Sequence, residues 1–485
     1  MAEPLTPVEQ AERSMAAWTV AILFMVVYVI GLFLYRRFNP DFPVAYTDIE
    51  EHFKYGSIGS EAANGIPYWI WKVLPEMFPE KLPAPGNGYA AFGFVFEPGQ
   101  DVPIGLAHRK VLIERLGMNC AICHTGTVRD APDSPRRIYL GMPANTYDLQ
   151  AYLRFLIACV SDGRFTADNV LRAIRSHTSL DPLERVVYTQ AVYQTREVLL
   201  QRARQTAFMA TRPDWGPGRV DTFNPYKTVQ FNFPMENDPS VGATDLPSIW
   251  DQSPRRGLQL HWDGNNDSME ERNKSAALGA GVTPVTIDLK SMKRIEDWLL
   301  DGLHAPKYPY PIDESLAGRG APIYQRYCAE CHDFGAAKVG KVTPIAEIAT
   351  DRGRLDSFTY EFAANMNLLY AGYPWRFTHF RKTDGYANMP LDGVWLRAPY
   401  LHNGSVPTLR HLLEPPEARP RQFYRGYDVY DRVKAGFVSD VAEEKGKRYF
   451  LYDTTLPGNG NGGHLYGTQL APAEKDALVE YMKKL

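Results

Sequence analysis

The pattern Cys-x-x-Cys-His occurs twice in this sequence, and it restricts the fold and chemistry of the chain more than any other feature. The first motif lies in "NCAICHTG" and the second in "YCAECHDFG". The residues concerned are Cys120, Cys123, His124, Cys328, Cys331 and His332. Thiols three residues apart lie about one helical turn from each other, so both sulfurs can reach one edge of a porphyrin. The two motifs therefore predict two covalently bound haem c groups, with the adjacent histidines as proximal ligands of the iron.

Two other chemistries also use closely spaced cysteines. Two Cys pairs can form a zinc site, but the pairs must then lie close in space, and a long stretch of chain separates them here. A redox-active Cys-x-x-Cys pair does not require a histidine at the next position in both copies. Haem attachment is therefore the favoured interpretation. The fifth cysteine, Cys159, lies in the apolar stretch "AYLRFLIACV", and we expect it to be a buried structural thiol.

An uncharged, apolar run extends from Ala16 to Tyr35. Its length of about 20 residues matches the hydrocarbon thickness of a bilayer, and Trp18 and Tyr35 have positions typical of interfacial aromatics. A signal peptide would have a shorter apolar region of about 7–15 residues, followed by a small-residue cleavage site. We therefore predict a transmembrane signal anchor at residues 16–36, after a short N-terminal tail at residues 1–15.

The charges around this run and the haem motifs indicate opposite orientations. Arg36 and Arg37 follow the run, whereas Arg13 and the amino terminus precede it, which alone would keep the main domain cytoplasmic. Haem c is attached outside the cytoplasm, and we give this argument more weight. We therefore expect a single-pass protein of the bacterial inner membrane with its haem domains in the periplasm. The net charge of −3 gives no indication of a nucleic-acid partner.

Helical patterns dominate the rest of the chain, so we predict a mainly α fold with two cytochrome c-like haem domains behind a single N-terminal transmembrane helix. Apolar residues recur at helical spacing in several stretches, which are residues 147–165, 182–207, 290–303, 314–332 and 471–485. Residues 38–118 indicate loops and short helices. The prolines of "HAPKYPYPID" mark a connector at residues 305–313. It would join a first haem domain with inserted helices, residues 37–304, to a second cytochrome c domain, residues 314–485.

Three further stretches resemble the bacterial dihaem cytochrome c peroxidase superfamily, and within it the RoxA-like branch of rubber oxygenases. They are "HWDGNNDSMEERN" at 261–273, "PLDGVWLRAPYLHNGSVPTLRHLLEP" at 390–415 and "NGNGGHLYG" at 459–467. With the haem motifs, the resemblance covers most of the chain after the anchor. It implies a haem-dependent oxidoreductase with electron transfer between its haems. Its substrate would be peroxide, or dioxygen together with an apolar compound.

By this resemblance, Trp262 is the tryptophan between the two haems. The catalytic Gln of the peroxidases falls on Arg272, and their catalytic Glu falls in "ALGAGVTP", which has no carboxylate. Arginine cannot serve as a base, but Arg272 could stabilise an anionic oxygen ligand. The alternative for Arg272 is a solvated helix residue. Ser268 and Glu271 form the sequence pattern of a capping box at the start of the helix.

The distal ligands of the two irons decide their roles, because six-coordinate iron suits electron transfer and five-coordinate iron can bind substrate. For the second haem the resemblance favours His464 in "NGNGGHLYG", and Met389 in "ANMPL" is the alternative. His402 is expected to orient groups around the haem. For the first haem we find no convincing distal ligand, since His108 and His177 are expected to be exposed and His261 also fits a structural role. This favours an open, reactive iron above His124.

These observations favour an enzyme, a membrane-anchored periplasmic dihaem cytochrome of the peroxidase or dioxygenase type. The alternative is a non-catalytic cytochrome that serves a membrane respiratory chain. In both cases the expected partner is a small redox donor or acceptor, such as a cytochrome or a quinol chain.

Overall fold

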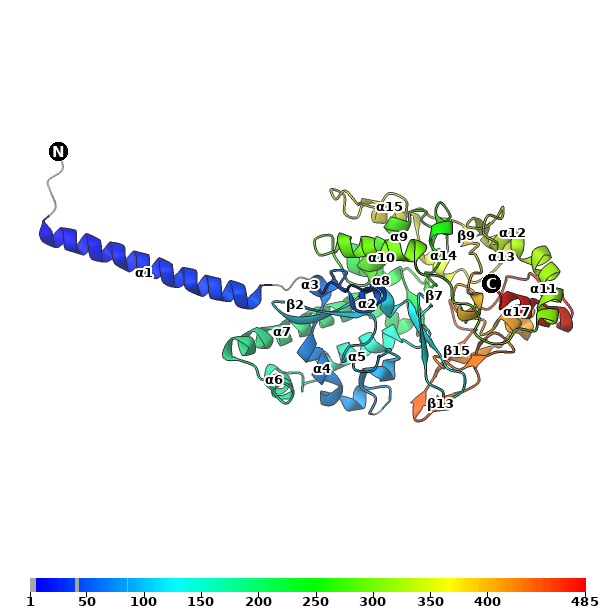
Figure 1. Cartoon of the computed structure of the whole chain (residues 1–485), viewed down its shortest axis with the longest axis horizontal. Coiled ribbons are helices and arrows are strands. Elements are labelled where there is room, and N and C mark those ends of the chain that lie inside the picture. Colours follow the sequence, from blue (N-terminus) through cyan, green and yellow to red (C-terminus); the bar gives the residue numbers. More distant parts are fainter. Residues whose placement is uncertain (1–5, 40–42, 85) are drawn as a thin grey trace.

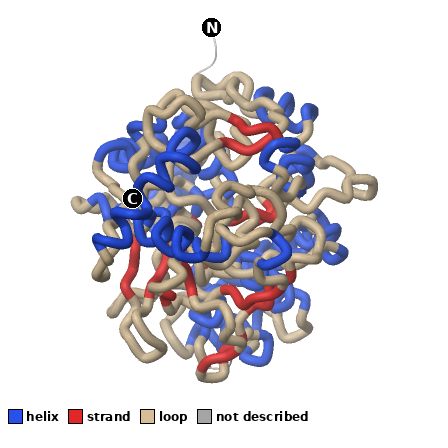
Figure 2. The backbone as a smooth tube through the Cα atoms, turned by 90° about the vertical axis from the view of Figure 1, so that its right-hand side faces the viewer, coloured by secondary structure: helices blue, strands red, loops and turns tan. Residues whose placement is uncertain are grey.

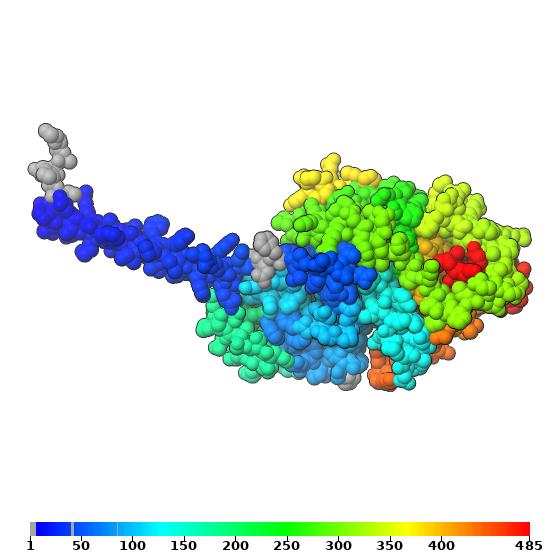
Figure 3. Space-filling view, viewed as in Figure 1, coloured from blue at the N-terminus to red at the C-terminus, as the bar shows by residue number. Residues whose placement is uncertain are grey.

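The computed structural model describes residues 6–39, 43–84 and 86–485. Its first helix, α1 (Pro7–Phe38), projects from the body of the molecule (Figures 1 and 3) and has no buried residue. A capping box between Thr6 and Glu9 starts this helix, so it begins well before the predicted span at 16–36. Within the described ranges, α1 is the helix that is long and apolar enough to cross a membrane. It is therefore a membrane anchor or a signal sequence.

The end of α1 is attached to the body by an ion pair. The Arg37 guanidinium lies 3.1 Å from the Asp181 carboxylate and also contacts Glu184. Asp181 and Glu184 form the capping box of α7 (Pro182–Gln205), and so the junction is fixed at the N-terminus of that helix.

The body is mainly helical, with short strands and many loops (Figure 2). The helices between α1 and the predicted connector are α2 (Ile49–Tyr55), α3 (Ser60–Asn64), α4 (Tyr68–Met77), α5 (Leu149–Ser161), α6 (Ala167–Arg175), α7, α8 (Asn224–Phe231), α9 (Met269–Gly279) and α10 (Leu289–Asp301). The later helices are α11 (Glu314–Tyr327), α12 (Ala329–His332), α13 (Ile345–Ile348), α14 (Gly353–Ser357), α15 (Tyr360–Leu368), α16 (Leu409–Leu412) and α17 (Pro472–Met482). The 3-10 turns are η1 (Pro79–Lys81), η2 (Gly88–Phe92), η3 (Cys120–Ile122), η4 (Ala207–Thr211), η5 (Ser253–Arg255), η6 (Val394–Leu396) and η7 (Pro416–Ala418).

The strands are short and pair antiparallel. They are β1 (Ile66–Pro67), β2 (Leu106–Val111), β3 (Ile113–Met118), β4 (Thr125–Val128), β5 (Arg137–Leu140), β6 (Arg219–Asp221), β7 (Ala243–Asp245), β8 (Val342–Pro344), β9 (Gly385–Ala387), β10 (Gln422–Arg425), β11 (Tyr430–Asp431), β12 (Gly436–Phe437), β13 (Glu443–Glu444), β14 (Lys447–Arg448) and β15 (Phe450–Asp453). The largest sheet has the order β1-β3-β2. The expected loops and short helices over 38–118 are confirmed by α2, α3 and α4, but the expectation omitted the strands β1, β2 and β3. The β2–β3 hairpin was missed because its charged residues interrupt the apolar alternation that marks a strand.

The helices predicted from apolar spacing are confirmed as α5, α7, α10, α11 and α17. In α10, Met292, Ile295 and Leu299 form the buried face that their spacing predicts. Cys159 in α5 is fully buried, as expected of a structural thiol.

The helix before the second motif packs closely against the helix that closes the chain. At Gly320 in α11, an added Cβ would lie 2.0 Å from the carbonyl oxygen of Ala477 in α17. Only glycine allows this approach of the two backbones. The contact holds the start of the second motif against the end of the chain, and Figure 1 shows α11 and α17 side by side.

The two largest hydrophobic cores each take residues from both sides of the predicted connector. Phe358, Phe362 and Phe380 pack in the core that is built mainly by the first half of the chain. Val128 and Trp250 pack in the core of the second half. The connector itself lies against this second core, because Trp395 Nε1 donates a hydrogen bond to its Pro306 carbonyl at 2.8 Å. The domain limits at 304 and 314 remain a prediction.

A buried carboxylate joins the β4–β5 hairpin to the second half of the chain. Asp428, with 1 % of its side chain exposed, accepts hydrogen bonds from Thr127 at 2.7 Å, Arg129 Nε at 2.6 Å and Arg136 Nε at 2.7 Å. Burial alone would raise the pKa of Asp428, but the Arg136 charge and these hydrogen bonds outweigh it and lower the pKa. The carboxylate is therefore ionised and paired at neutral pH.

We expect Asp428→Asn to lower the free energy of unfolding at pH 7 by about 3 kcal/mol, because it leaves the buried Arg129 and the exposed Arg136 without this charged partner. A carboxyl with a lowered folded pKa stabilises the fold above its unfolded pKa of about 3.9, and this contribution is lost as the pH falls through the folded value. The difference in the free energy of unfolding between the variant and the wild type should therefore become smaller below about pH 4. Denaturant unfolding at several pH values from 7 to 3 measures this difference. Asp440→Asn, at an exposed position, is the control. A difference that does not change with pH would contradict this role.

Candidate haem site

A single continuous cavity of about 1210 Å³ runs through the interior. Its volume exceeds the range of about 300–1,000 Å³ that is typical of a pocket for one small ligand. Both motifs and every other predicted site residue line it, namely Cys120, Cys123, His124, Trp262, Arg272, Cys328, Cys331, His332, Met389, His402 and His464. The fold therefore brings together residues that are far apart in the sequence.

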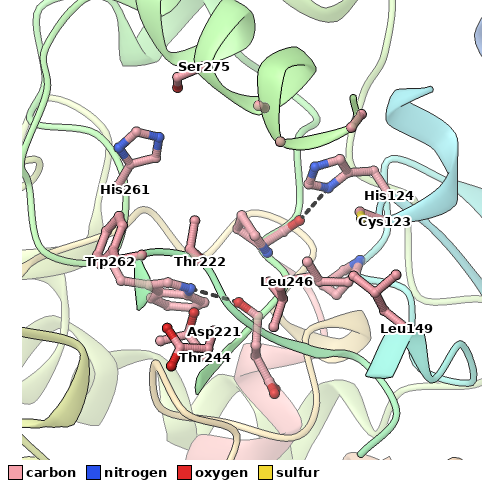
Figure 4. Close-up of a pocket in the computed structure, with 18 of the residues that line it drawn as sticks. Cys123, His124, Leu149, Asp221, Thr222, Thr244, Leu246, His261, Trp262 and Ser275 are labelled. Atoms are coloured by element: carbon pink, nitrogen blue, oxygen red, sulfur yellow. Dashed lines mark hydrogen bonds between the residues drawn. The ribbon is translucent and has the colours of Figure 1, made fainter. Parts of the chain in front are cut away.

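The first motif forms the helical turn η3, as the spacing of its thiols predicts. Asn119 caps this turn by accepting a hydrogen bond from Ala121 N at 3.0 Å. Gly105 has a φ of +95°, and an added Cβ would lie 2.3 Å from Ile122 N, so only glycine fits beneath the turn. His124 Nδ1 donates a hydrogen bond to the Pro247 carbonyl at 2.9 Å (Figure 4). This bond leaves Nε2 as the ring nitrogen available to a ligand.

The environment of the first motif suits haem attachment better than redox chemistry of a thiol pair. Burial raises the pKa of Cys120 to about 11 and that of Cys123 to about 12, whereas a redox-active pair needs a lowered thiol pKa. None of the described cysteines forms a disulfide. Burial also lowers the pKa of His124 to about 4, so its imidazole is neutral, which is the form that binds metals.

The second motif spans the junction of α11 and α12, and His332 lies at the end of α12. His332 Nδ1 donates a hydrogen bond to the Met389 carbonyl at 2.6 Å. The centroids of the His332 and His464 rings are 6.3 Å apart. Two metal–imidazole bonds of about 2 Å each account for about 4 Å of this separation, and the rest corresponds to the half-widths of the two rings. The pair therefore has the spacing of two axial ligands on one metal ion.

The loop that carries His464 is held tightly in an unusual backbone conformation. His464 has a φ of +47°, which is uncommon for a residue with a side chain. At Gly463 an added Cβ would lie 2.4 Å from the carbonyl oxygen of Ile348. His464 N also donates a hydrogen bond to this carbonyl at 2.8 Å. The glycine is needed for backbone contact with the C-terminal end of α13.

Arg419 is buried and binds the His464 loop through backbone carbonyls. Its guanidinium donates to the carbonyls of Gly463 at 2.9 Å and His464 at 3.2 Å. The other acceptors are the carbonyls of Leu412, Glu414 and Asn461. Arg419 was not predicted as a site residue, because no local sequence pattern marks an arginine whose partners lie in distant segments.

We expect Arg419→Met to displace His464 from the cavity. Each buried carbonyl that loses its donor costs about 1–3 kcal/mol, so the free energy of unfolding should fall by at least about 3 kcal/mol. Arg419→Lys keeps the positive charge and one or two of the hydrogen bonds. It should therefore retain part of the stabilisation that Arg419 provides. The absorption spectrum of the holoprotein and denaturant unfolding measure the two consequences. The exposed Arg421→Met is the control, and equal behaviour of the two methionine variants would exclude this role.

Met389 and His402 occupy different positions around the cavity. Met389 contributes its backbone carbonyl to His332, so it lies on the side of this ring away from the cavity-facing Nε2. His402 is buried and stacks on Tyr386 at a centroid distance of 4.0 Å. Its Nε2 has no hydrogen-bond partner among the described residues. This orphaned buried nitrogen is consistent with a ligand group in the adjacent space.

Trp262 lies where the two halves of the chain meet. Its Nε1 donates to the Asp245 carbonyl at 2.8 Å, and its own carbonyl accepts from Ala387 N in β9. It packs in a small cluster with Ile345, Leu355 and Tyr386. A residue between two haems would need such contacts with both halves.

Arg272 is a cavity residue and not a solvated surface arginine. Its guanidinium donates to Gln252 Oε1 at 2.6 Å and to Asn273 Oδ1 at 2.8 Å, and burial lowers its pKa to about 10. Among the described residues it has no carboxylate in salt-bridge contact. Ser268 caps α9 as predicted, but the reciprocal half of the capping box is wrong. The Glu271 carboxylate turns away and accepts hydrogen bonds from the backbone N–H groups of Thr378 and His379.

The remaining histidines of interest lie in three settings. His177 is exposed and contacts Glu76, as expected. His108 is half-buried and stacks on Tyr68 at 4.5 Å, so its expected exposure is only partly correct. His261 lines the cavity. In the part of the chain that the structure describes, no group of three or more His, Cys, Asp and Glu side chains could hold a metal ion, so the two Cys pairs do not meet in a joint zinc cluster.

Comparison with known proteins bears on the segment that contains His402. Residues 385–425 match the model of the RoxA-like, cytochrome c-like family. The resemblance predicted from the sequence is thus confirmed over this segment. A RoxA-like, cytochrome c-like segment implies haem c, and the thiols, imidazoles and volume of the cavity fit that group.

Two similar proteins come from Sinorhizobium fredii (strain NBRC 101917 / NGR234), and both are described as uncharacterized. Protein y4iM is 34% identical over 292 residues, which is 51% of this chain and 66% of y4iM. Protein y4iJ is 25% identical over 609 aligned positions, which cover 98% of this chain and 100% of y4iJ. Neither similarity adds a known activity.

Proposed function

We propose that this chain is a dihaem c-type cytochrome that carries out an oxidoreductase reaction at the first haem and exchanges electrons through the second. The observation that carries the proposal is the arrangement of both Cys-x-x-Cys-His motifs on one cavity. His464 lies opposite His332, and among the described residues no corresponding ring lies against His124. The RoxA-like segment at 385–425 supports the haem group.

At the second motif, His332 and His464 would be the two axial ligands. Iron held by two imidazoles has no free position, and such iron suits electron transfer. The Met389 carbonyl orients the His332 ring through Nδ1, and Arg419 fixes the loop of His464. These contacts would hold both imidazole rings in fixed positions, as ligands of an electron-transfer iron require.

At the first motif, Cys120 and Cys123 would attach the haem and His124 would bind its iron. The bound haem supplies iron that can take up and activate peroxide or dioxygen. The Arg272 guanidinium, which makes no salt bridge to a carboxylate of the described residues, lines this region and can stabilise negative charge there. Apolar side chains of α5, α7 and α8, such as Leu153, Leu199 and Val229, line the same cavity and exclude water from an apolar substrate.

Trp262 would lie between the two haems, since it contacts both halves of the chain and lines the cavity. The redox partner would be a small donor or acceptor, such as a cytochrome or a quinol chain. With α1 retained as an anchor, the haem-bearing body would lie on the periplasmic side of the bacterial inner membrane.

Absorption and electron paramagnetic resonance spectra of the purified holoprotein test the proposal. We expect one low-spin haem that ignores carbon monoxide and one high-spin haem that binds it. Turnover with peroxide plus a reduced cytochrome, set against dioxygen plus an unsaturated isoprenoid, then identifies the substrate class. Two low-spin haems that ignore both carbon monoxide and peroxide would instead identify a non-catalytic electron carrier.

A further inference from the structure

His261 faces the first motif across the cavity. Figure 4 draws His124 and His261 on opposite sides of the open space, with Trp262 and Thr222 on the wall below and Ser275 above. In the described structure His124 and His261 make no ring pair of the kind that joins His332 to His464. The described rings of His124 and His261 therefore do not have the spacing of two imidazoles that hold one metal ion.

The loop of His261 is rigid and strained. Leu260 N donates to the Asn266 carbonyl at 2.7 Å and closes a turn, in which His261 has a φ of +63°. A histidine in the left-handed region is uncommon and costs about 1–3 kcal/mol, and such strain is concentrated at functional sites.

A chain of buried groups fixes the protonation pattern of His261. Arg354 donates to the Asp263 carboxylate at 2.9 and 3.0 Å, and Asn265 Nδ2 donates to the same carboxylate at 2.9 Å. Because a carboxylate only accepts, the amide oxygen of Asn265 must face His261, 2.6 Å from its Nδ1. His261 Nδ1 therefore donates, and Nε2 keeps a free lone pair.

Charges around His261 keep the ring neutral. Burial lowers the pKa of His261 to about 4, with further lowering by the charges of Arg354 and Arg272, against the opposing effects of Asn265 and Asp263. Arg272 and His124 line the same cavity as His261. A neutral imidazole with a free lone pair and a guanidinium thus share the site that would hold haem.

We infer that His261 Nε2 is the proton acceptor for a small protic ligand, of the class H–X, that binds opposite His124. The inference rests on the proposed haem at the first motif. When H–X enters, its proton moves to Nε2 and X⁻ remains at the position opposite His124. No electron moves in this step. The imidazolium of His261 and the guanidinium of Arg272 then flank the anion.

This assignment supplies the acid–base group that the peroxidase-type Gln and Glu positions lack in this sequence. It comes from the residue next to Trp262 and not from α9. A role as an iron ligand is the competing possibility. Among the described residues, His261 forms no ring pair with His124 like that of His464 with His332, which argues against it.

Two ligands separate these possibilities in the holoprotein. Hydrogen cyanide must lose a proton on binding, whereas carbon monoxide has none to lose. General base assistance contributes about 10²- to 10⁴-fold, so His261→Leu should slow cyanide association by this factor and leave carbon monoxide binding to the reduced protein within about twofold. His261→Gln can keep the hydrogen bond to Asn265, so it serves as a second variant in case His261→Leu does not fold. His108→Phe, outside the cavity lining, is the matched control.

Unchanged cyanide association in both His261 variants would overturn the inference and leave the proposed function intact. A first haem that is low-spin in the wild type and becomes high-spin and ligand-binding in the variants would identify His261 as an iron ligand, which also overturns it. A wild-type protein in which neither haem binds cyanide or carbon monoxide would overturn the proposed function as well.

Discussion

The double substitution Cys120→Ser and Cys123→Ser is expected to remove one of two haem c groups from the denatured chain and to leave the other attached. Substituting Cys328 and Cys331 should have the same result for the other haem. Each group would be held through its own pair of thiols, and both pairs line the same cavity. The quadruple variant should retain no pigment.

These variants are also expected to lose much of their stability. At about 24 cal/mol per Å³ of cavity, leaving even a quarter of the 1210 Å³ empty costs about 7 kcal/mol. This is comparable to the whole stability of a domain, about 5–15 kcal/mol.

A denaturing gel stained for haem and the mass of the intact chain measure haem attachment, and thermal unfolding measures stability. Cys159→Ala is the control, since this buried thiol lies outside the cavity lining and should leave both haems attached. A wild-type mass equal to that of the bare polypeptide would remove the basis of the proposed function.

His464→Ala is expected to convert the second haem from low-spin iron to high-spin iron that binds carbon monoxide. Removing this imidazole opens the position opposite His332, whose ring centroid lies 6.3 Å from that of His464. His464→Met should instead keep the iron six-coordinate and raise its reduction potential, because thioether ligands favour the reduced state more than imidazole does.

Spectra with carbon monoxide and a redox titration of each variant measure these changes. His411→Ala is the matched control, because His411 lies outside the cavity lining and bonds to Thr408. If Met389→Ala opened the second haem and His464→Ala did not, the assignment of the sixth ligand would pass to Met389.

The sequence was most informative where the chemistry is local. Attachment of haem needs Cys, Cys and His within five consecutive positions, so the motif alone predicts both the turn and the ligand. The helix of Met292, Ile295 and Leu299 was predicted for the same reason, since its apolar period is contained in one segment. The stretch "APYLHNGSVPTL" carried the family resemblance, and the match of the family model to residues 385–425 confirms that resemblance.

The features that the sequence did not reveal depend on contacts between distant segments. Arg419 acts on a loop about 45 residues further along the chain. The tautomer of His261 follows from a hydrogen-bond chain that ends at Arg354. Phe358 and Phe380 follow the connector in the sequence but pack in the core that is built mainly by the first half of the chain. The apolar pattern around them does not indicate this. Periodicity describes which face of a segment is apolar, but not which other segment covers that face.

The attachment of α1 at Arg37 affects the directions from which reactants would reach the two Cys-x-x-Cys-His motifs. The ion pair with Asp181 and Glu184 places the junction at the α7 end of the body, and Figure 1 shows α11, α17 and the C-terminus at the opposite end. If α1 stays in the bilayer, the half with the first motif adjoins the lipid and the half with the second projects into water. A lipid-soluble reactant would then approach the α7 end of the body, and a water-soluble redox protein would approach the end formed by α11 and α17. The two would not compete for the same surface.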